Sequence, residues 1–340
     1  MKLTMTRETK NAIERIGTVI PADRLMKAEP MNRHTSFRIG GPAACFAELQ
    51  NEEELAAVLA VLAKNDAEYM LVGNGSNLLV ADEGYPGIIV KLGGDFDGIS
   101  IDEDDETLVH VGAARLMSSA SVFLTEHGLS GFEFASGIPG SIGGAVFMNA
   151  GAYGGEMKDI IESVRMMPIS HSEHGEKSEA KSIYPLGTIN EEGEVKVKAF
   201  DISADEMGFG YRTSRAQAED MIILSADFRL KKDDPVEIAG RVRELAEKRN
   251  SKQPVNYPSA GSTFKRPAGG YAAALIEEAG LKGYRVGGAV VSEKHSGFVI
   301  NEGGATAEDV LAVMRYVRGT VYEKSGIMLE PEVRLINCGL

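Results

Sequence analysis

Three chemically competent side chains stand far apart in this sequence of 340 residues. Arg212 lies in a turn rich in glycine and aromatic residues, Ser262 in a turn of small residues, and Glu332 near the C-terminus. An arginine binds a carboxylate through two parallel hydrogen bonds, and a hydroxyl on a tight turn can donate a proton. Each residue also has a structural alternative: Arg212 can cap a turn, Ser262 can satisfy backbone groups, and Glu332 can pair with Arg334.

Several familiar catalytic patterns are missing from the sequence. No Ser-His-Asp order, HExxH motif, paired cysteines or phosphate-loop lysine is present, which disfavours common hydrolases, metalloproteases and nucleoside triphosphatases. Cys45 and Cys338 share no metal or redox spacing, so we expect free thiols. His171 and His174 have Glu173 between them, but two histidines in a charged, solvated run are seldom a metal site, and we expect no metal.

Two glycine-rich stretches are the leading candidates for holding a cofactor. Residues 136–155 include seven glycines among twenty residues, and the run Gly73-Asn74-Gly75-Ser76-Asn77 follows a short apolar strand. Glycine leaves backbone N–H groups open to an anion or a flat ring, so both loops can face one long ligand. Pro139 and the apolar run 145–148 predict rigid turns and then an extended segment, unlike a Rossmann loop. The alternative is a set of stacked turns in an all-β region.

Basic residues gather in the sequence before and after Ser262. The helix predicted from Asp234 carries several of them, and Lys252, Lys265 and Arg266 follow. A solvated helix face explains some of these charges. It explains Lys265 and Arg266 less well, because they stand in a loop bounded by glycine and proline, where cationic side chains can converge on phosphate.

The overall charge and hydropathy limit the partners of the chain. A net charge of −14 argues against binding to nucleic acid or to a membrane surface, since both need a long-range positive field. The N-terminus lacks the apolar core of a secretion signal, and no apolar run is long enough to span a bilayer. We therefore expect a cytoplasmic protein.

Helices and strands are predicted in a mixed order, without the regular alternation of a doubly wound fold, so the expected class is α+β. Asn51, Asp234 followed by Pro235, and Thr306 with Asp309 are helix-start signals. The expected helices cover 52–64, 116–127, a segment starting at 235, a segment ending at 280 and a long segment after 306. The expected strands cover 69–72, 78–80, 87–92, 107–111, 221–230 and 297–301, with a last one containing 332–334.

The ordered motifs resemble those of one family, the UDP-N-acetylenolpyruvoylglucosamine reductases (MurB). The chain lacks an extra tyrosine-bearing segment between Arg212 and Ser262, so it is similar to the shorter subclass. The matching motifs, which extend from about residue 30 to the C-terminus, are Gly73-Asn74-Gly75-Ser76-Asn77, Ile138-Pro139-Gly140-Ser141-Ile142-Gly143-Gly144, Asn149-Ala150-Gly151-Ala152-Tyr153-Gly154, Tyr211-Arg212-Thr213-Ser214, Ala260-Gly261-Ser262-Thr263-Phe264-Lys265-Arg266-Pro267 and Glu330-Pro331-Glu332-Val333-Arg334.

The resemblance implies an FAD flavoprotein of bacterial peptidoglycan synthesis. Its FAD-binding region would be of the two-part vanillyl-alcohol-oxidase (PCMH) type, followed by a C-terminal α+β substrate-binding domain. The implied units are a first FAD-binding subdomain at 1–95, a second at 96–233 with a surface insertion at about 171–198, and a substrate-binding domain at 234–340. NADPH would supply the hydride and a UDP-sugar would accept it, giving UDP-N-acetylmuramate, and we expect the chain to act as a monomer.

The same resemblance assigns roles to individual residues. Ser262 would donate the proton, while Arg212 and Glu332 would stabilise the enol-type intermediate. Hydride addition to one alkene carbon leaves negative charge on the other carbon and its carboxylate, which agrees with these roles. The implied cofactor-binding residues are Thr35, Gly73, Asn74, Gly75, Ser76, Asn77, Ser136, Gly137, Pro139, Gly140, Ser141, Gly143, Gly144 and Gly210. The implied substrate-binding residues are Tyr211, Lys252, Lys265 and Arg266.

Two other functions remain open at this point. One is a different FAD oxidoreductase on the same scaffold, which would take its electrons from an organic substrate and not from NADPH. The other is a non-catalytic sensor of flavin or nucleotide sugar, which would bind its ligand without turnover.

Overall fold

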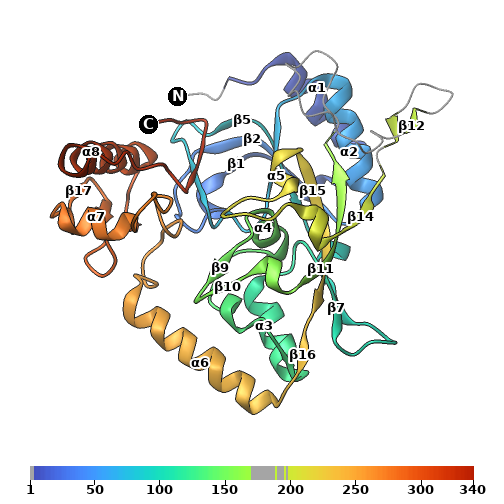
Figure 1. Ribbon diagram of the computed structural model, residues 1–340. Helices are drawn as coiled ribbons and strands as arrows, with labels where there is room; N and C mark the ends of the chain where they lie inside the picture. The colour runs from blue at the N-terminus through green and yellow to red at the C-terminus, as the bar shows by residue number, and fades with distance from the viewer. Residues whose placement is uncertain (1–3, 170–187, 190–194, 197) are drawn as a thin grey trace.

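The computed structural model describes residues 4–169, 188–189, 195–196 and 198–340 (Figure 1). Most of the insertion expected at 171–198 lies outside the described residues, as do His171, Glu173, His174 and the hairpin turn expected around Glu191 to Gly193. Within that range two short strands are described, and they pair antiparallel. In the part of the chain that is described, no helix is both long and apolar enough to cross a membrane.

The chain mixes helices and strands, and the α+β class expected from the sequence is confirmed. The helices are α1 Arg7–Ile16, α2 Glu52–Asn65, α3 Met117–Glu126, α4 Ile142–Phe147, α5 Arg215–Ala218, α6 Pro235–Lys252, α7 Ala272–Glu278 and α8 Ala307–Ser325. The strands are β1 Leu25–Pro30, β2 Pro42–Leu49, β3 Tyr69–Val72, β4 Leu78–Val80, β5 Tyr85–Leu92, β6 Ile99–Ile101, β7 Leu108–Gly112, β8 Leu129–Ser130, β9 Gly151–Ala152, β10 Gly155–Glu156, β11 Ile161–Pro168, β12 Thr188–Ile189, β13 Val195–Lys196, β14 Phe200–Ser203, β15 Met221–Arg229, β16 Lys231–Lys232, β17 Arg285–Val286, β18 Ala289–Val291, β19 Val299–Asn301 and β20 Arg334–Ile336.

The first sheet has the strand order β1-β2-β5-β3, with β5 parallel to both β2 and β3. Helix α2 begins where expected, because the Asn51 side chain accepts a hydrogen bond from the backbone N–H of Glu54. The run of residues 73–77 directly follows the end of β3, and β4 follows that run. Strand β4 pairs in parallel with β20, the last strand of the chain, so the first glycine-rich loop lies beside the C-terminal segment (Figure 1).

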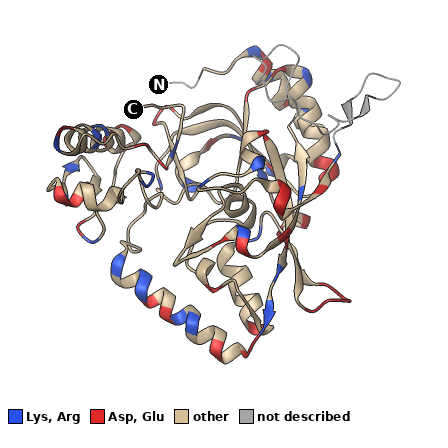
Figure 2. Cartoon of the chain, in the orientation of Figure 1, with Lys and Arg blue, Asp and Glu red and all other residues tan. Residues whose placement is uncertain are grey.

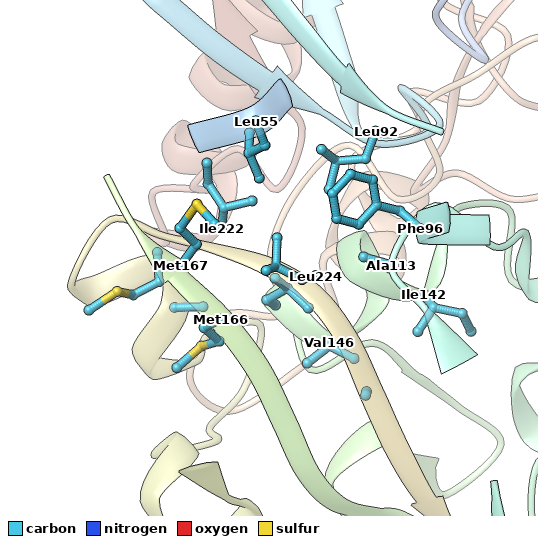
Figure 3. Close-up of a cluster of buried hydrophobic side chains, with 14 of the residues drawn as sticks. Leu55, Leu92, Phe96, Ala113, Ile142, Val146, Met166, Met167, Ile222 and Leu224 are labelled. Atoms are coloured by element: carbon cyan, nitrogen blue, oxygen red, sulfur yellow. The ribbon is translucent and has the colours of Figure 1, made fainter. Parts of the chain in front are cut away.

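The second sheet is antiparallel, with the order β14-β11-β15-β7-β6. Figure 3 shows part of the core that joins the two sheets, in which Leu55 and Leu92 approach Ile222 and Leu224 from the first sheet and its helix. Helix α4 packs against β15. The second glycine-rich loop is therefore fixed to the larger hydrophobic core of the protein.

The extended segment expected after Pro139 is wrong, because residues 142–147 form helix α4. Ser141 caps the helix, its Oγ accepting a hydrogen bond from the backbone N–H of Gly144. Ile142 and Val146 are four residues apart and both are fully buried, so one face of α4 packs into the core. Burial of that face outweighs the low helix propensity of the paired glycines.

A second, smaller hydrophobic core is built mostly from the C-terminal region, and Phe37, Ile39 and Leu79 from the N-terminal part of the chain complete it. Helix α8 begins with the expected capping box of Thr306 and Asp309 and buries seven side chains. Asp82, which follows β4, also accepts hydrogen bonds from the first N–H groups of α8, those of Ala307 and Glu308. The last strand begins at Arg334, so the expectation that Glu332 belongs to this strand is wrong.

Candidate active site

Arg212 and Glu332 form an ion pair across 120 residues of sequence. Arg212 Nε donates to Glu332 Oε1 at 2.7 Å, and the two side chains are 24% and 13% exposed. Among the described residues, the Nη1 and Nη2 atoms of Arg212 have no hydrogen-bond partner. Glu332 therefore holds the guanidinium in one orientation and leaves its two terminal nitrogens available to a second carboxylate.

The turn that carries Arg212 is tightly constrained. Gly210 and Thr213 exchange backbone hydrogen bonds of 3.1 and 3.4 Å, and Arg212 between them has φ of +56°. A left-handed backbone is unfavourable for arginine, and such residues are concentrated at functional sites. The buried Asn149 supports the turn, since its Nδ2 donates to the Gly210 carbonyl at 3.0 Å.

Asn149 also donates to Glu156 Oε2 at 3.0 Å, so it connects the Arg212 turn to the hairpin of β9 and β10. The pKa of Glu156 lies below its usual range because Lys158 donates to it, and Asn149 and Arg212 lower it further against the opposing effect of burial. Asn149 was not among the site residues expected from the sequence. Its place at the start of the 149–154 motif was the available signal.

Glu332 and Ser262 are brought together by an antiparallel contact between two loops. The backbone N–H of Glu332 donates to the Thr263 carbonyl at 2.9 Å, and the N–H of Lys265 donates to the Glu330 carbonyl at 2.8 Å. Ser262 precedes Thr263, is exposed, and has no hydrogen-bond partner among the described residues. Ser262 is thus the residue directly before Thr263, whose carbonyl positions Glu332.

A cavity of about 390 Å³ surrounds the Arg212–Glu332 pair. We refer to it as the Arg212 cavity. It is lined by Met148, Tyr211, Arg212, Thr213, Gln217, Lys265, Pro331, Glu332, Val333 and Arg334. Of the expected substrate-binding residues, Tyr211 and Lys265 line this cavity, and Arg266 follows Lys265 in the chain.

Tyr211 and Arg266 lie together at this cavity. The Tyr211 hydroxyl accepts a hydrogen bond from the Arg266 backbone N–H at 3.3 Å. The Arg266 guanidinium stacks over the ring of Tyr271 at 4.1 Å from its centroid, a cation–π contact that was not expected from the sequence. Lys252 is different, because it ends α6 as an exposed side chain and makes no hydrogen bond or ion pair with the other site residues in the described chain.

Helix α6 carries the other basic residues of this region (Figure 2). Arg241 is ion-paired with Glu133 and Asp233, so its charge is already used within the protein. Arg249 packs against Gly137 of the second glycine-rich loop, where a Cβ would lie 3.0 Å from its Cδ. The positive charge of α6 is thus only partly directed toward a ligand.

The two glycine-rich loops touch each other. A Cβ built on Gly73 would lie 2.5 Å from Ser141 Oγ, and one on Gly140 would lie 3.2 Å from Ser76 Oγ. Gly73, Asn74, Gly137, Pro139 and Gly144 are exposed, so bare backbone from both loops faces outward at this junction. An uncharged, open backbone surface formed by two loops fits the diphosphate and flat ring of FAD.

Other expected cofactor residues have a role in packing. Gly75 has φ of +61°, and a Cβ there would overlap the carbonyl oxygen of His34. Thr35 is buried and donates to the Ile39 carbonyl at 2.9 Å, and Ser136 donates to the Glu133 carbonyl at 2.8 Å. A Cβ on Gly143 would lie 2.8 Å from that of Ala113. These contacts pack the two loops against the rest of the protein.

The described residues contain no group of three or more His, Cys, Asp or Glu side chains that could hold a metal ion. Cys45 and Cys338 are free thiols, as expected. Burial raises the pKa of the Cys45 thiol to about 11. This cysteine therefore remains protonated and packs as an apolar side chain.

Comparison with known proteins gives matches along most of the chain. Residues 43–168 match the model of an FAD binding domain, and residues 253–336 match the C-terminal domain of UDP-N-acetylenolpyruvoylglucosamine reductase. The reductase of that name from Lachnoclostridium phytofermentans is 42% identical over 325 residues, covering 95% of this chain and 96% of the relative. The one from Caldanaerobacter subterraneus subsp. tengcongensis is 43% identical over 324 residues, covering 95% and 97%.

A solved structure agrees with these matches. The crystal structure of UDP-N-acetylenolpyruvylglucosamine reductase (MurB) from Thermus caldophilus superposes with a TM-score of 0.70 at 33% identity, covering 92% of this chain and 98% of that one. The expected combination of an FAD-binding region with a C-terminal α+β domain is thereby confirmed. Identity at this level over nearly the whole length shows that the chain belongs to the UDP-N-acetylenolpyruvoylglucosamine reductase (MurB) family.

Proposed function

We propose that this chain catalyses the FAD-dependent, NADPH-using reduction of UDP-N-acetylenolpyruvoylglucosamine to UDP-N-acetylmuramate in peptidoglycan synthesis. Family membership and the FAD-binding domain support this reaction. FAD, when bound, takes a hydride from NADPH and delivers it to the enolpyruvyl double bond. The exposed backbone at the junction of the 73–77 and 136–144 loops would hold this cofactor.

The assignment of the site rests on the guanidinium of Arg212, which has only one of its three nitrogens hydrogen-bonded within the described chain. Its Nε is bound by Glu332, its two terminal nitrogens have no hydrogen-bond partner in the described chain, and Arg212 lines the Arg212 cavity. A substrate carboxylate would accept two parallel hydrogen bonds from them. Because negative charge spreads onto that carboxylate as hydride arrives, the fixed cation binds the transition state more tightly than the ground state.

Ser262 would supply the proton that completes the reduction. The carbon next to the carboxylate must be protonated, and the exposed Ser262 hydroxyl stands one residue before the backbone contact of Thr263 with Glu332. Gly261, with φ of +75°, makes the sharp turn that presents this hydroxyl. Glu332 would orient Arg212 and balance its charge.

The UDP part of the substrate would lie toward Tyr211, Lys265 and Arg266. Lys265 lines the cavity, and Arg266 is held beside it by Tyr211. Two cations near one loop suit the diphosphate. Lys252 would join them only through a change in the side chains at the end of α6.

Anaerobic mixing tests the proposed function directly. The FAD-loaded protein is mixed with NADPH and then with the enolpyruvyl UDP-sugar, while the flavin absorbance is followed. We expect NADPH to bleach the flavin band and the UDP-sugar to restore it. Bleaching by a hydroxy acid or an alcohol in place of NADPH would instead indicate an oxidase, and ligand binding without turnover would indicate a sensor.

We also propose that the enzyme acts as a cytoplasmic monomer with units at 1–95, 96–233 and 234–340. The nucleotide-linked substrates of the proposed reaction support the compartment. A second hydrophobic cluster, made mostly of residues after 259 together with Phe37, Ile39 and Leu79, supports a substrate-binding unit that packs against the first unit. Light scattering after size-exclusion chromatography should give the mass of one 36.4 kDa chain with its cofactor. A mass of two chains would overturn the monomer.

A further inference from the structure

Asn77 ends the first glycine-rich loop, and within the described chain its hydrogen bonds all lead to the segment that carries Glu332. Asn77 Nδ2 donates to the Glu332 carbonyl at 3.0 Å, and the Asn77 carbonyl accepts from the Arg334 N–H at 2.9 Å. The next residue, Leu78, pairs with Arg334 at the start of the β4–β20 ladder. Asn77 therefore binds the residue before Val333 through its side chain and the residue after Val333 through its backbone carbonyl.

The loop that holds Asn77 is itself firmly placed. The Ser36 N–H donates to the Gly75 carbonyl at 3.1 Å, and Gly75 packs directly on the carbonyl of His34. Strand β3 precedes the loop in the first sheet, and β4 follows it. Asn77 is thus a fixed point from which the Glu332 segment can be positioned.

In the described part of the chain, two hydrogen bonds hold the Glu332 backbone. Its N–H is held by the Thr263 carbonyl at 2.9 Å, and its carbonyl is held by the Asn77 carboxamide. Its side chain then reaches Arg212 at 2.7 Å. Loss of the Asn77 donor would leave the Glu332 carbonyl without its hydrogen bond. The Glu332 residue, whose side chain binds Arg212, would then be less firmly positioned.

We propose that Asn77 is a positioning residue for the Glu332–Arg212 pair, acting through the Glu332 carbonyl, and that this is its main contribution to the reaction. The inference rests on the proposed role of Glu332. It differs from the expectation drawn from sequence, which placed Asn77 among residues that bind FAD. The cofactor loop and Glu332 are thus parts of one hydrogen-bonded unit.

The first test compares Asn77→Ala with Asn74→Ala. Asn74 is the same residue type on the same loop, but it is exposed and makes no contact with the Glu332 segment in the described structure. Asn77→Ala should lower kcat by about tenfold or more, because small displacements of catalytic groups have large effects on rate. Its dissociation constant for FAD, measured by fluorescence titration of the apoprotein, should change by less than about threefold. Asn74→Ala serves as the reference for a loss that acts through the cofactor.

A double-mutant cycle with Glu332→Gln identifies the route of the effect. If Asn77 acts through Glu332, then Asn77→Ala should reduce kcat much less in the Glu332→Gln background than in the wild type. Multiplicative losses would overturn the inference. So would a fall in FAD affinity that parallels the fall in kcat, because that would make Asn77 a cofactor contact.

A second variant at Asn77 distinguishes a protein that fails to fold from one that folds but no longer positions Glu332. Asn77→Asp keeps the shape of the side chain but removes the Nδ2 donor. It should show the same loss of kcat with a retained FAD dissociation constant, and wild-type kcat in Asn77→Asp would overturn the inference. Wild-type kcat in Glu332→Gln alone would instead refute the proposed role of Glu332, and the role of Asn77 would fall with it.

Discussion

Two of the cavities in the described part of the chain are lined by charged side chains, and the larger of these two shares no lining residue with the Arg212 cavity. The larger cavity, of about 550 Å³, lies between the start of α2 and the second sheet, and we call it the His110 cavity. Both ring nitrogens of His110 are bound there, to Asp227 at 2.7 Å and to Asp102 at 3.1 Å. Arg165 in its wall binds Glu52 and Asp201 through all three guanidinium nitrogens.

The Arg212 cavity has the opposite character. Arg212 uses only Nε within the described chain, and the neighbouring Ser262 hydroxyl has no partner there at all. A polar group satisfied by the protein gains little from a ligand, whereas an oriented donor without a partner gains a full hydrogen bond. The comparison teaches that unused hydrogen-bonding capacity, and not cavity volume, distinguishes the candidate active site.

The strongest test of this comparison uses one serine from each region. Ser262→Ala should slow reduction of the UDP-sugar by about 10²- to 10⁴-fold, because general acid catalysis is lost, while reduction of the flavin by NADPH is spared. Ser163→Ala is the matched control, since Ser163 donates to Asp227 near the His110 cavity. Stopped-flow absorbance separates the two halves. Equal slowing of both halves in Ser262→Ala would make Ser262 a packing residue, and Ser262→Cys should keep part of the rate because a thiol can donate.

A pair of arginines gives the next test. Arg212→Lys should lower kcat by about 10²- to 10³-fold, because a lysine cannot offer two parallel donors to the carboxylate and one to Glu332 at once. Arg165→Lys should leave kcat near the wild-type value, since its ion pairs with Glu52 and Asp201 are internal to the fold. Steady-state kinetics with saturating NADPH measures both. Comparable losses in the two variants would remove the distinction between the cavities.

The substrate-binding cations should show a smaller and different effect. Arg266→Ala should raise KM for the UDP-sugar by about tenfold with little change in kcat, because a phosphate contact is made equally in the ground and transition states. Arg241→Ala is the control, because Arg241 is already paired with Glu133 and Asp233. An unchanged KM in Arg266→Ala would mean that Arg266 does not contact the substrate and is a solvated surface residue beside Tyr271.

The smallest expected effect lies in the His110 cavity and concerns stability. The hydrogen bond to Asp227, with a further one to Asp102, raises the pKa of His110 against the opposing effect of burial. A raised pKa means that the folded state holds the proton more tightly, so the stabilisation is complete below about pH 6.5 and is lost as the pH rises through the raised value. Urea unfolding midpoints should therefore fall modestly with rising pH above about 6.5, and less so in His110→Gln. An identical pH dependence in the variant would contradict this role.

Local signals in the sequence were sufficient for much of the fold. Asn51, Asp234 with Pro235, and Thr306 with Asp309 each start a helix in the structure, because a cap is an interaction within a few residues. The α4 helix was missed for the complementary reason. Its glycines disfavour a helix locally, and only burial of Ile142 and Val146 in the core stabilises it.

The glycine-rich loops show where sequence reasoning reached its limit in the site. Glycine density correctly marked two loops that lie in contact, but it did not separate their glycines by role. The packing of Gly75 on His34 and of Gly137 on Arg249 involves residues far away in the chain. Which glycine opens toward a ligand and which accommodates the protein itself depends on that packing.

The sequence by itself determined the family and the fold class and indicated the candidate catalytic residues, because these are carried by ordered motifs that can be read along the chain. Tertiary structure alone decided that Glu332 binds one nitrogen of Arg212 and leaves two available. It also decided that Asn77 holds the Glu332 carbonyl and that His110 is fully satisfied. These contacts join residues that the β4–β20 ladder and the second sheet bring together. The register between such distant strands is set by which face of each strand is buried in the core, and no short sequence motif encodes that choice.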